Sequence, residues 1–174
     1  MDDQDNELML KFKEGDISAF EELLKKYEKS ILNLVYHFLG NSNDAEDLTQ
    51  EVFLRVYRAR ETWQPKAKFS TWLYRITANL CFNWRRKKTP LSLEDLSILP
   101  STTNGSSENT EIKKEIQKAL LSLPKNQRLA LILCHYEDKS YQEIGELLGC
   151  SVSSVKSLIF RARQNLKTKL KHLI

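Results

Sequence analysis

The chain has 174 residues, of which 41% are hydrophobic and 29% charged, and it carries a formal net charge of +4. This length accommodates one domain or two small ones. No apolar run approaches the roughly 20 residues of a membrane-spanning helix, and the acidic N-terminus lacks the apolar segment of a signal peptide. The three cysteines, Cys81, Cys134 and Cys150, are widely spaced and form no CxxC pair. We therefore expect a cytoplasmic protein with reduced thiols and without a metal ion or another cofactor.

Positive charge is concentrated in two stretches that contain no Asp or Glu. Residues 62–88 carry a charge of +7 together with all three tryptophans, and residues 147–174 carry +6. Clustered cations attract phosphate groups, and aromatic faces stack on the bases of single-stranded nucleic acid. The first stretch supplies both, whereas the second supplies mainly cations. The pattern favours a protein that binds opened DNA with one part and duplex DNA with the other.

Composition also divides the chain into two parts. Residues 89–111 are rich in Ser, Thr, Asn and Pro, hold four acidic and no basic residues, and show no sustained helical period. A segment of this kind is typical of a linker. We therefore predict two small helical domains, residues 1–88 and 112–174, joined by an extended linker over residues 89–111.

Three helices are predicted in the first domain. Residues 18–21 form a capping box, which begins a helix that Gly40 ends. Asn43 is expected to cap the next helix, whose acidic first turn suits the positive end of the helix dipole. Ser70 is expected to cap a third helix that runs to about Lys88. Apolar residues recur with helical spacing in both domains and no alternating strand pattern is present, so the predicted fold class is all-α.

The second domain is predicted to end in a helix-turn-helix. Pro124 suits the first turn of a helix, and residues 140–143 form another capping box. Gly149 provides a turn, and Ser151 is expected to cap the last helix. That helix has an apolar face and an opposite polar, basic face. A solvated basic helix that completes a bundle is the alternative, although solvated faces usually mix both signs of charge and no acidic residue follows Glu146.

These motifs resemble those of bacterial RNA polymerase sigma factors of the extracytoplasmic-function group. The segments similar to sigma region 4 are residues 123–128 (LPKNQR), 140–149 (SYQEIGELLG), 155–157 (VKS) and 161–163 (RAR). The segments similar to sigma region 2 are residues 44–53 (DAEDLTQEVF) and 69–76 (FSTWLYRI), followed by Asn79, Arg85 and Arg86. The resemblance covers nearly the whole chain apart from the first ten residues and the linker. One departure is the turn at residues 137–139, Glu-Asp-Lys, where family members often have a glycine.

The resemblance implies a promoter-specificity subunit and not an enzyme. Its implied partners are core RNA polymerase, through the β′ clamp helices and the β flap, promoter DNA and an anti-sigma factor, with no small-molecule substrate. The residues expected to hold the melted −10 strand are Trp63, Lys66, Lys68, Phe69, Ser70, Arg75, Asn79, Arg85 and Arg86. Those expected to contact the −35 duplex are Ser153, Ser154, Lys156, Ser157, Phe160, Arg161 and Arg163. Those expected to bind the polymerase are Asp47, Gln50, Glu51, Phe53 and Leu54.

Several of these assignments have alternatives. Phe53 and Leu54 can pack inside the first domain, and Trp72 lies at the spacing of a core residue. The acidic linker either mimics a nucleic-acid strand or is a plain tether. A stand-alone helix-turn-helix regulator with an N-terminal sensor or dimerisation domain is the alternative function. A nucleic-acid-processing enzyme is disfavoured, because the three histidines are scattered and the sequence has no Gly-rich phosphate loop.

Overall fold

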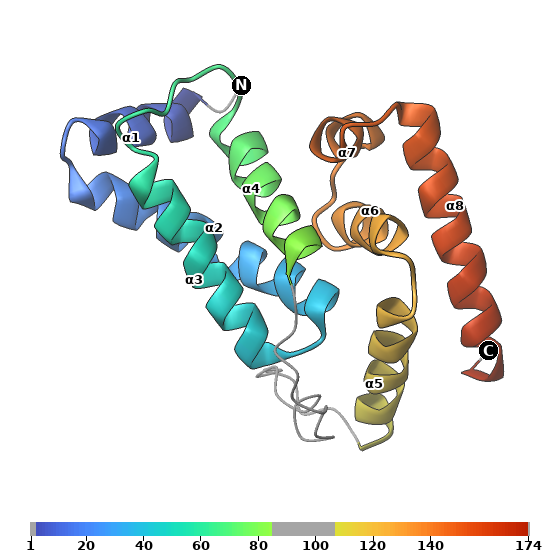
Figure 1. Cartoon of the computed structure of the whole chain (residues 1–174). Coiled ribbons are helices and arrows are strands. Elements are labelled where there is room, and N and C mark those ends of the chain that lie inside the picture. The colour runs from blue at the N-terminus through green and yellow to red at the C-terminus, as the bar shows by residue number, and fades with distance from the viewer. Residues whose placement is uncertain (1–2, 85–106, 174) are drawn as a thin grey trace.

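The protein is described here by a computed structural model over residues 3–84 and 107–173, in which all regular elements are helices (Figure 1). In chain order they are α1 (Asp3–Lys13), α2 (Ile17–Leu39), α3 (Ser42–Arg58), α4 (Phe69–Asn83), α5 (Ser107–Leu121), α6 (Lys125–His135), α7 (Tyr141–Leu148), α8 (Val152–Lys169) and the short 3-10 helix η2 (Lys171–Leu173). The all-α prediction is confirmed. None of these helices is both long and apolar enough to cross a membrane.

Two features differ from the predicted organisation. Helix α1 was not predicted. Helix α5 begins at Ser107, inside the range predicted as linker, and linker residues 89–106 lie outside the described residues.

The first four helices form one bundle, in which α2 and α3 lie side by side and α1 and α4 pack against them (Figure 1). Leu23, Ile31 and Leu34 recur on one face of α2 and are buried, as an amphipathic helix requires. Phe12 from α1 and Phe38 from α2 are among the largest fully buried side chains. This core fixes the positions of α3 and of the loop that joins it to α4, both of which carry predicted site residues.

The last four helices form a smaller unit around α6. Leu129 and Ile132 of α6 are fully buried, and Ile144 of α7 and Ile159 of α8 belong to the same core. Between α7 and α8, Gly149 has a φ of +68°, a left-handed conformation that glycine adopts at little cost. The predicted helix-turn-helix is therefore present, with α8 as its second helix.

Two helix starts in the first half differ from prediction. Asp16, not Ser18, caps α2, because its Oδ1 accepts a hydrogen bond from Ala19 N at 3.4 Å. Asn41, not Asn43, caps α3, accepting from Asp44 N at 2.9 Å. In each case the two candidates are good capping residues two positions apart, so the local sequence does not separate them.

The limits of α4 also differ from prediction. The helix begins at Phe69 and is not capped by Ser70, and Lys68, at the N-cap position, provides no side-chain cap. The helix ends at Asn83, because Trp84 has an extended backbone with a ψ of 120°. The predicted continuation to Lys88 is therefore wrong.

The local signals of the second half are confirmed more closely. Glu143 N donates to Ser140 Oγ at 3.1 Å and Ser140 N donates to Glu143 Oε2 at 2.7 Å, which completes the predicted capping box. Ser151 caps α8, accepting from Ser154 N at 3.1 Å. Pro124 lies at the N-cap of α6, one position before the first turn. In the turn before α7, Asp138 has a φ of 49°, the left-handed conformation for which a glycine is better suited.

Arg128 joins the C-terminal ends of two helices. Its Nη1 donates to Phe38 O of α2 at 2.9 Å, and its Nε donates to Leu120 O of α5 at 3.0 Å. Its Nη2 donates to Leu121 O at 2.6 Å and to Leu123 O at 2.9 Å. Because the last carbonyl groups of a helix have no intrahelical partner, one guanidinium group here satisfies acceptors from both halves of the chain.

We expect Arg128→Lys to lower the free energy of unfolding by about 2–4 kcal/mol, because one ammonium group cannot reach the carbonyl groups of both helix ends. Urea denaturation followed by circular dichroism measures the change. Arg163→Lys is the matched control, because Arg163 is exposed on α8, and its expected effect is within about 0.5 kcal/mol. Equal losses in the two variants would contradict this role of Arg128.

Candidate nucleic-acid and polymerase interfaces

Helix α8 presents all of its predicted duplex-binding residues to solvent. Val155, Ile159 and Ala162 are buried and fix the helix against the rest of the second half. The residues on its exposed surface include Ser153, Ser154, Lys156, Ser157, Phe160, Arg161 and Arg163. Phe160 is 64% exposed, which is unusual for a phenylalanine that has no binding partner. The exposed surface therefore combines hydroxyl groups, cations and one aromatic ring, which suits contacts to base edges and phosphates.

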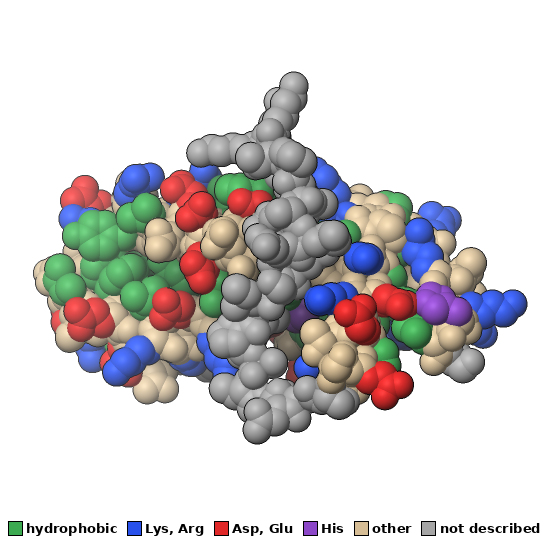
Figure 2. All heavy atoms as spheres, turned by 90° about the horizontal axis from the view of Figure 1, so that it is seen from below, with side chains coloured by type: hydrophobic (Ala, Val, Ile, Leu, Met, Phe, Trp, Pro, Cys, Tyr) green, Lys and Arg blue, Asp and Glu red, His purple; other side chains and the backbone are tan. Residues whose placement is uncertain are grey.

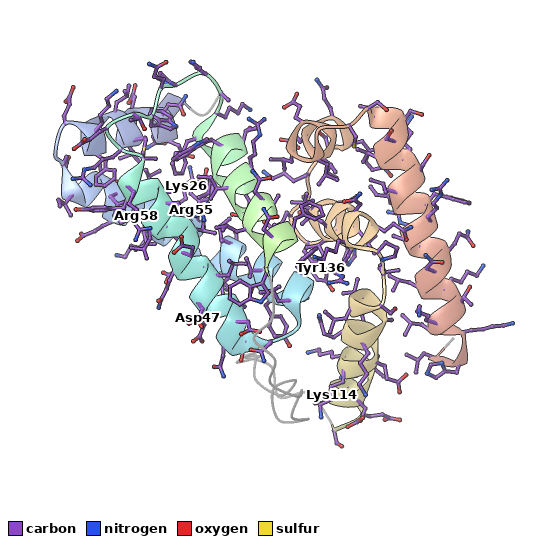
Figure 3. All side chains as sticks on the ribbon, viewed as in Figure 1. Lys26, Asp47, Arg55, Arg58, Lys114 and Tyr136 are labelled. Carbon is purple, nitrogen blue, oxygen red and sulfur yellow. The ribbon has the colours of Figure 1, made fainter. Side chains whose placement is uncertain are left out.

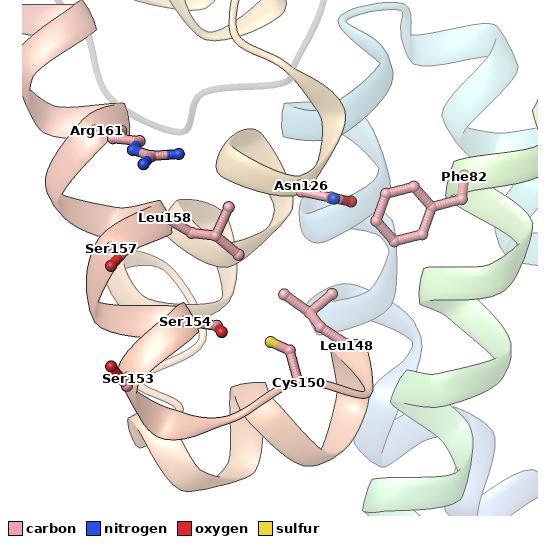
Figure 4. A pocket seen from close by; sticks show the side chains of 9 residues that line it. All are labelled: Phe82, Asn126, Leu148, Cys150, Ser153, Ser154, Ser157, Leu158 and Arg161. Atoms are coloured by element: carbon pink, nitrogen blue, oxygen red, sulfur yellow. The ribbon is translucent and has the colours of Figure 1, made fainter.

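Part of this surface faces α4 across a hollow of about 490 Å³ (Figure 4). Arg161, Ser157 and Ser154 line one side, and Phe82 of α4 and Asn126 of α6 line the other. No acidic residue is among the described residues that line this α4–α8 hollow. The two halves of the chain thus lie close together beside the predicted duplex-binding surface.

The loop between α3 and α4 encloses a second hollow, of about 470 Å³. It is lined by Ala59, Thr62, Trp63, Gln64, Lys66, Ala67, Trp72 and Arg75. The ring centroids of Trp63 and Trp72 are 6.2 Å apart, and the rings are tilted against each other. Lys66 and Arg75 are exposed at its border. This loop hollow offers aromatic walls to a base and cations to a phosphate, without a neighbouring carboxylate among its lining residues.

The predicted −10 residues divide by burial. Lys66, Lys68, Arg75 and Asn79 are exposed, and Ser70 is half-buried. Trp63 is mostly buried but still lines the loop hollow.

One of these assignments is wrong, and two are not covered. Phe69 is fully buried, with its ring 5.7 Å from that of Tyr27 and 5.8 Å from that of Trp72, so its ring packs in the core beneath the loop and is not exposed to a ligand in this structure. Arg85 and Arg86 lie outside the described residues.

The predicted polymerase-binding residues border a third, mainly apolar hollow between α2 and α3. Its lining residues are Phe20, Leu24, Glu28, Thr49, Gln50, Phe53, Leu54 and Tyr57. Leu54 is 47% exposed, whereas Phe53 is only 6% exposed and packs mainly inside the bundle, as the alternative interpretation held. Phe20 and Leu24 were missed, because their helical spacing marked them as core.

Glu28 is the one charged residue among the described residues that line this α2–α3 hollow, and further charged residues lie on α3. Asp47 is exposed on α3 (Figure 3), and Glu51 is half-buried and pairs with Arg55, Oε1 to Nε, at 3.1 Å. Figure 2 shows hydrophobic side chains gathered over the first half of the chain, with acidic side chains beside them. An exposed apolar patch with a polar border is typical of a protein-docking surface.

The two halves meet around His37 of α2. Its ring stacks on that of Tyr136, which follows α6, with centroids 3.9 Å apart (Tyr136 is labelled in Figure 3). Gln117 of α5 donates from Nε2 to His37 O at 3.0 Å. Farther along the contact, Tyr74 of α4 donates its hydroxyl hydrogen to Glu137 Oε2 at 2.6 Å. Polar and aromatic contacts therefore link α2 and α4 to the second half.

Burial perturbs the titratable groups of this contact. It lowers the pKa of His37 below its usual value of 6.5; the hydrogen bond with Gln117 opposes this shift, and nearby His135 adds to it. Burial raises the pKa of Glu137, against the lowering effects of the Tyr74 hydroxyl and of Lys139. Among the described residues, no cluster of His, Cys, Asp and Glu side chains could hold a metal ion.

Comparison with known proteins identifies the class. The sequence models of Sigma-70 region 2 and Sigma-70, region 4 match residues 23–90 and 113–166. The chain is 35% identical over 178 residues to the ECF RNA polymerase sigma factor SigW of Bacillus subtilis, covering 92% of this chain and 94% of the relative. It is 37% identical over 166 residues to the ECF RNA polymerase sigma factor SigE of Mycolicibacterium smegmatis, covering 90% of this chain and 64% of the relative. The fold and these matches define a sigma-70 family factor with regions 2 and 4. Within that family, the protein belongs to the extracytoplasmic-function (ECF) group.

Two solved structures share the fold. CnrH, in complex with the cytosolic domain of CnrY, has a TM-score of 0.74 at 22% identity, covering 97% of both chains. The sigma factor RpoE of Bartonella quintana, in complex with the anti-sigma factor NepR, has a TM-score of 0.70 at 23% identity, covering 87% of this chain and 96% of that one.

We expect the two halves to separate as the pH falls below the usual pKa of His37. The packed arrangement lowers the pKa of His37, so the neutral imidazole contributes its full stabilisation to this arrangement above pH 6.5. Below pH 6.5 the separated state takes up a proton on His37 more readily than the packed state does, and the stabilisation is lost. Glu137 acts in the opposite direction: its pKa is raised in the packed state, so it adds stabilisation as the pH falls from that raised pKa towards the usual value of 4.5. Small-angle X-ray scattering from about pH 7.5 to about pH 5.5 should show a rising radius of gyration.

His37→Gln should abolish this response, because the amide does not titrate. His135→Gln is the matched control and should keep most of it, because His135 is exposed. A response that persists unchanged in His37→Gln would show that another group titrates.

We expect Phe160→Ala to change the free energy of unfolding by less than about 0.5 kcal/mol, because its ring is exposed. Ile159→Ala, its buried neighbour on α8, should cost about 2–5 kcal/mol. Urea denaturation of both variants tests this. A large loss of unfolding free energy in Phe160→Ala would mean that the ring stabilises the fold and is not simply an exposed group available to a ligand.

Proposed function

We propose that this protein binds core RNA polymerase, contacts the −35 duplex with α8 and holds the melted −10 strand at the loop between α3 and α4. The observation that carries the proposal is the pair of separate, cationic surfaces, one on a helix-turn-helix and one around an aromatic hollow. Duplex DNA suits the first and unstacked bases suit the second. The family is one of non-catalytic transcription initiation factors, and the protein is accordingly proposed to act with the polymerase in the cytoplasm.

At the −35 element, side chains of α8 are assigned to different contacts. Arg161, which is exposed on α8, is assigned to a guanine edge, a contact that discriminates by about 1–3 kcal/mol. Phe160 supplies an apolar face for a thymine methyl group. Lys156 and Arg163 are assigned to phosphates, which position the helix without reading sequence.

At the −10 element, the loop hollow is assigned to a base that has left the stack. Trp63 and Trp72 provide its aromatic walls, and the exposed Lys66 and Arg75 at its border are assigned to the attached phosphates. Aromatic stacking on a base contributes about 1–3 kcal/mol, and it is available only when the base is unpaired. The loop therefore favours opened over duplex DNA.

The α2–α3 hollow is assigned to the β′ clamp helices of the polymerase. Leu24, Leu54 and Tyr57 provide an apolar surface, with Gln50 beside it and the acidic Asp47 and Glu51 on the same helix, α3. A helical partner with apolar and basic residues complements this surface. The second unit, which includes α6 and α7, is assigned to the β flap.

The packed arrangement of the two halves also bears on regulation. A duplex receives a recognition helix in a major groove about 12 Å wide, flanked by two phosphate backbones. In the structure, Phe82 and Asn126 face part of α8 across the α4–α8 hollow. We infer that α4 and α8 move apart when the duplex binds, and that an anti-sigma factor holds the protein in a form unable to bind promoter DNA. Both solved structures that share the fold contain a bound second protein, in one case named an anti-sigma factor.

A stand-alone helix-turn-helix regulator explains α8 but not the surfaces of the first half. Such a protein needs neither an aromatic hollow beside cations nor an exposed apolar surface with an acidic border. It also predicts no binding to core polymerase, whereas the proposed sigma factor binds core enzyme and requires it for promoter-dependent transcription.

We expect Arg161→Ala to weaken binding to a −35 duplex about tenfold or more while leaving polymerase binding unchanged. Leu54→Ala should weaken binding to core polymerase about tenfold while leaving duplex binding unchanged. Fluorescence anisotropy with labelled duplex, and competition for labelled core enzyme, measure the two affinities.

Transcription by purified core polymerase on a promoter library completes this test. The wild-type protein should direct transcripts from a defined set of promoters, and both variants should reduce their yield. The proposal fails if the wild-type protein neither binds core enzyme nor directs transcripts. Equal loss of both affinities in Arg161→Ala would mean that the residue maintains the fold.

A further inference from the structure

The loop between α3 and α4 is held from outside by α1. Asn6 Oδ1 accepts a hydrogen bond from Phe69 N at 2.8 Å, and Asn6 Nδ2 donates to Ala67 O at 3.4 Å. Lys13 Nζ donates to Trp63 O at 3.2 Å. Asn6 and Lys13 are seven residues apart, so they lie on one face of α1, about 10 Å apart along its axis. Helix α1 therefore contacts both the beginning and the end of the part of the loop that lines the hollow.

The N-terminus of α4 depends on the contact with Asn6. The first N–H groups of a helix have no intrahelical partner, and a side-chain oxygen of the N-cap residue usually accepts from one of them. The N-cap residue of α4, Lys68, provides no such oxygen. Asn6 supplies it to Phe69 from a position 63 residues away. The asparagine thus acts as a cap from another helix and fixes the point where the loop ends and α4 begins.

Helix α1 is itself anchored to α2 next to this cap. Asp5 is fully buried, accepts from Lys26 Nζ at 2.7 Å and also accepts a hydrogen bond from the Tyr27 hydroxyl. The ring of Tyr27 lies 5.7 Å from the ring of Phe69. Moving Asn6 away from the loop would therefore disturb a buried carboxylate and its partners. Such a group is costly to leave unpaired, so α1 provides a firm support.

We propose that α1, through Asn6, positions the loop hollow to receive a base of opened DNA; this inference rests on the function proposed above for that hollow. A hollow that is already formed avoids the entropy cost of ordering a loop when a ligand binds. Asn6 acts through the backbone of Ala67 and Phe69 and is a positioning residue. Helix α1 lies outside the segment matched by the region 2 sequence model, which begins at residue 23. The support therefore comes from a part of the chain that this sequence model does not include.

Three full-length variants test the proposal. Asn6→Ala removes both hydrogen bonds to the loop. Asn6→Asp keeps the oxygen that accepts from Phe69 N, and a carboxylate suits a helix N-terminus. Glu7→Ala is the matched control, because Glu7 is an exposed neighbour on the same helix. Amide hydrogen exchange of residues 62–69 reports the order of the loop, and exchange in α2 and α3 reports the rest of the bundle.

The same proteins are titrated with a 5′-labelled pool of single-stranded 12-mers of random sequence, and with a duplex pool. We expect Asn6→Ala to lose protection at Phe69 and to bind the single strands about tenfold more weakly, the size expected for a lost cap. Asn6→Asp should restore both properties, and Glu7→Ala should match the wild-type protein. Exchange in α2 and α3, and duplex binding, should remain unchanged in all three variants.

Two results would overturn the inference. Unchanged protection in Asn6→Ala would show that α1 does not hold the loop. Lost protection with unchanged single-strand binding would show that the held loop is not needed for DNA. Failure of the proposed function has a different signature: the wild-type protein then binds no single strands, while hydrogen exchange still decides whether α1 holds the loop.

Discussion

The relative placement of the two halves depends on a point where two helix C-termini meet. The ends of α2 and α5 each carry partial negative charge and carbonyl groups without helical partners, so they repel each other unless a cation lies between them. The guanidinium group of Arg128 lies there and donates to both ends. Gly40 then approaches Leu121 so closely that a Cβ would lie 2.6 Å from a methyl carbon. Gly40 also has a φ of +76°, a left-handed conformation that favours glycine, so the contact between the halves combines the hydrogen bonds of Arg128 with a glycine at the end of α2. The stacking of His37 on Tyr136 belongs to the same contact between the halves.

Helix α4 extends between the two proposed DNA sites and packs against the second half of the chain. Its first residue, Phe69, supports the loop hollow, and Phe82 near its end lines the α4–α8 hollow. The side-chain hydrogen bonds that α1 makes to the loop, through Asn6 and Lys13, lie within the first half. Lys68, at the end of the loop, also has an electrostatic interaction with Glu143 of α7. A separation of the halves would remove that interaction and leave the hydrogen bonds from α1 in place. In the function proposed above, a conformational change would control the duplex site, whereas the site for opened DNA would be formed in advance.

The sequence predicted the elements better than it predicted their side-chain environments. The helix-turn-helix was recoverable because Ser140, Glu143 and Ser151 form local capping contacts within three residues. Helix α1 was missed because its important contacts, through Asp5 and Asn6, reach residues 21 to 63 positions away. The burial of Phe69 was missed for the same reason: residue type and spacing fit equally a stacking platform and a core ring, and only the tertiary packing distinguishes them.

The acid-free stretch over residues 62–88 therefore has a more divided role than its composition indicated. Phe69 and Tyr74 are buried, and Trp63 and Trp72 form walls that are already packed. Side chains fixed in this way lose little rotamer freedom when a base arrives, whereas exposed lysines and arginines keep theirs. In the function proposed above, shape selection for an unpaired base is assigned to the rigid aromatic hollow, and attraction for phosphate is assigned to the exposed cations around it. The proposed support by α1 fits this division, because rigidity is needed at the aromatic walls and not at the charges.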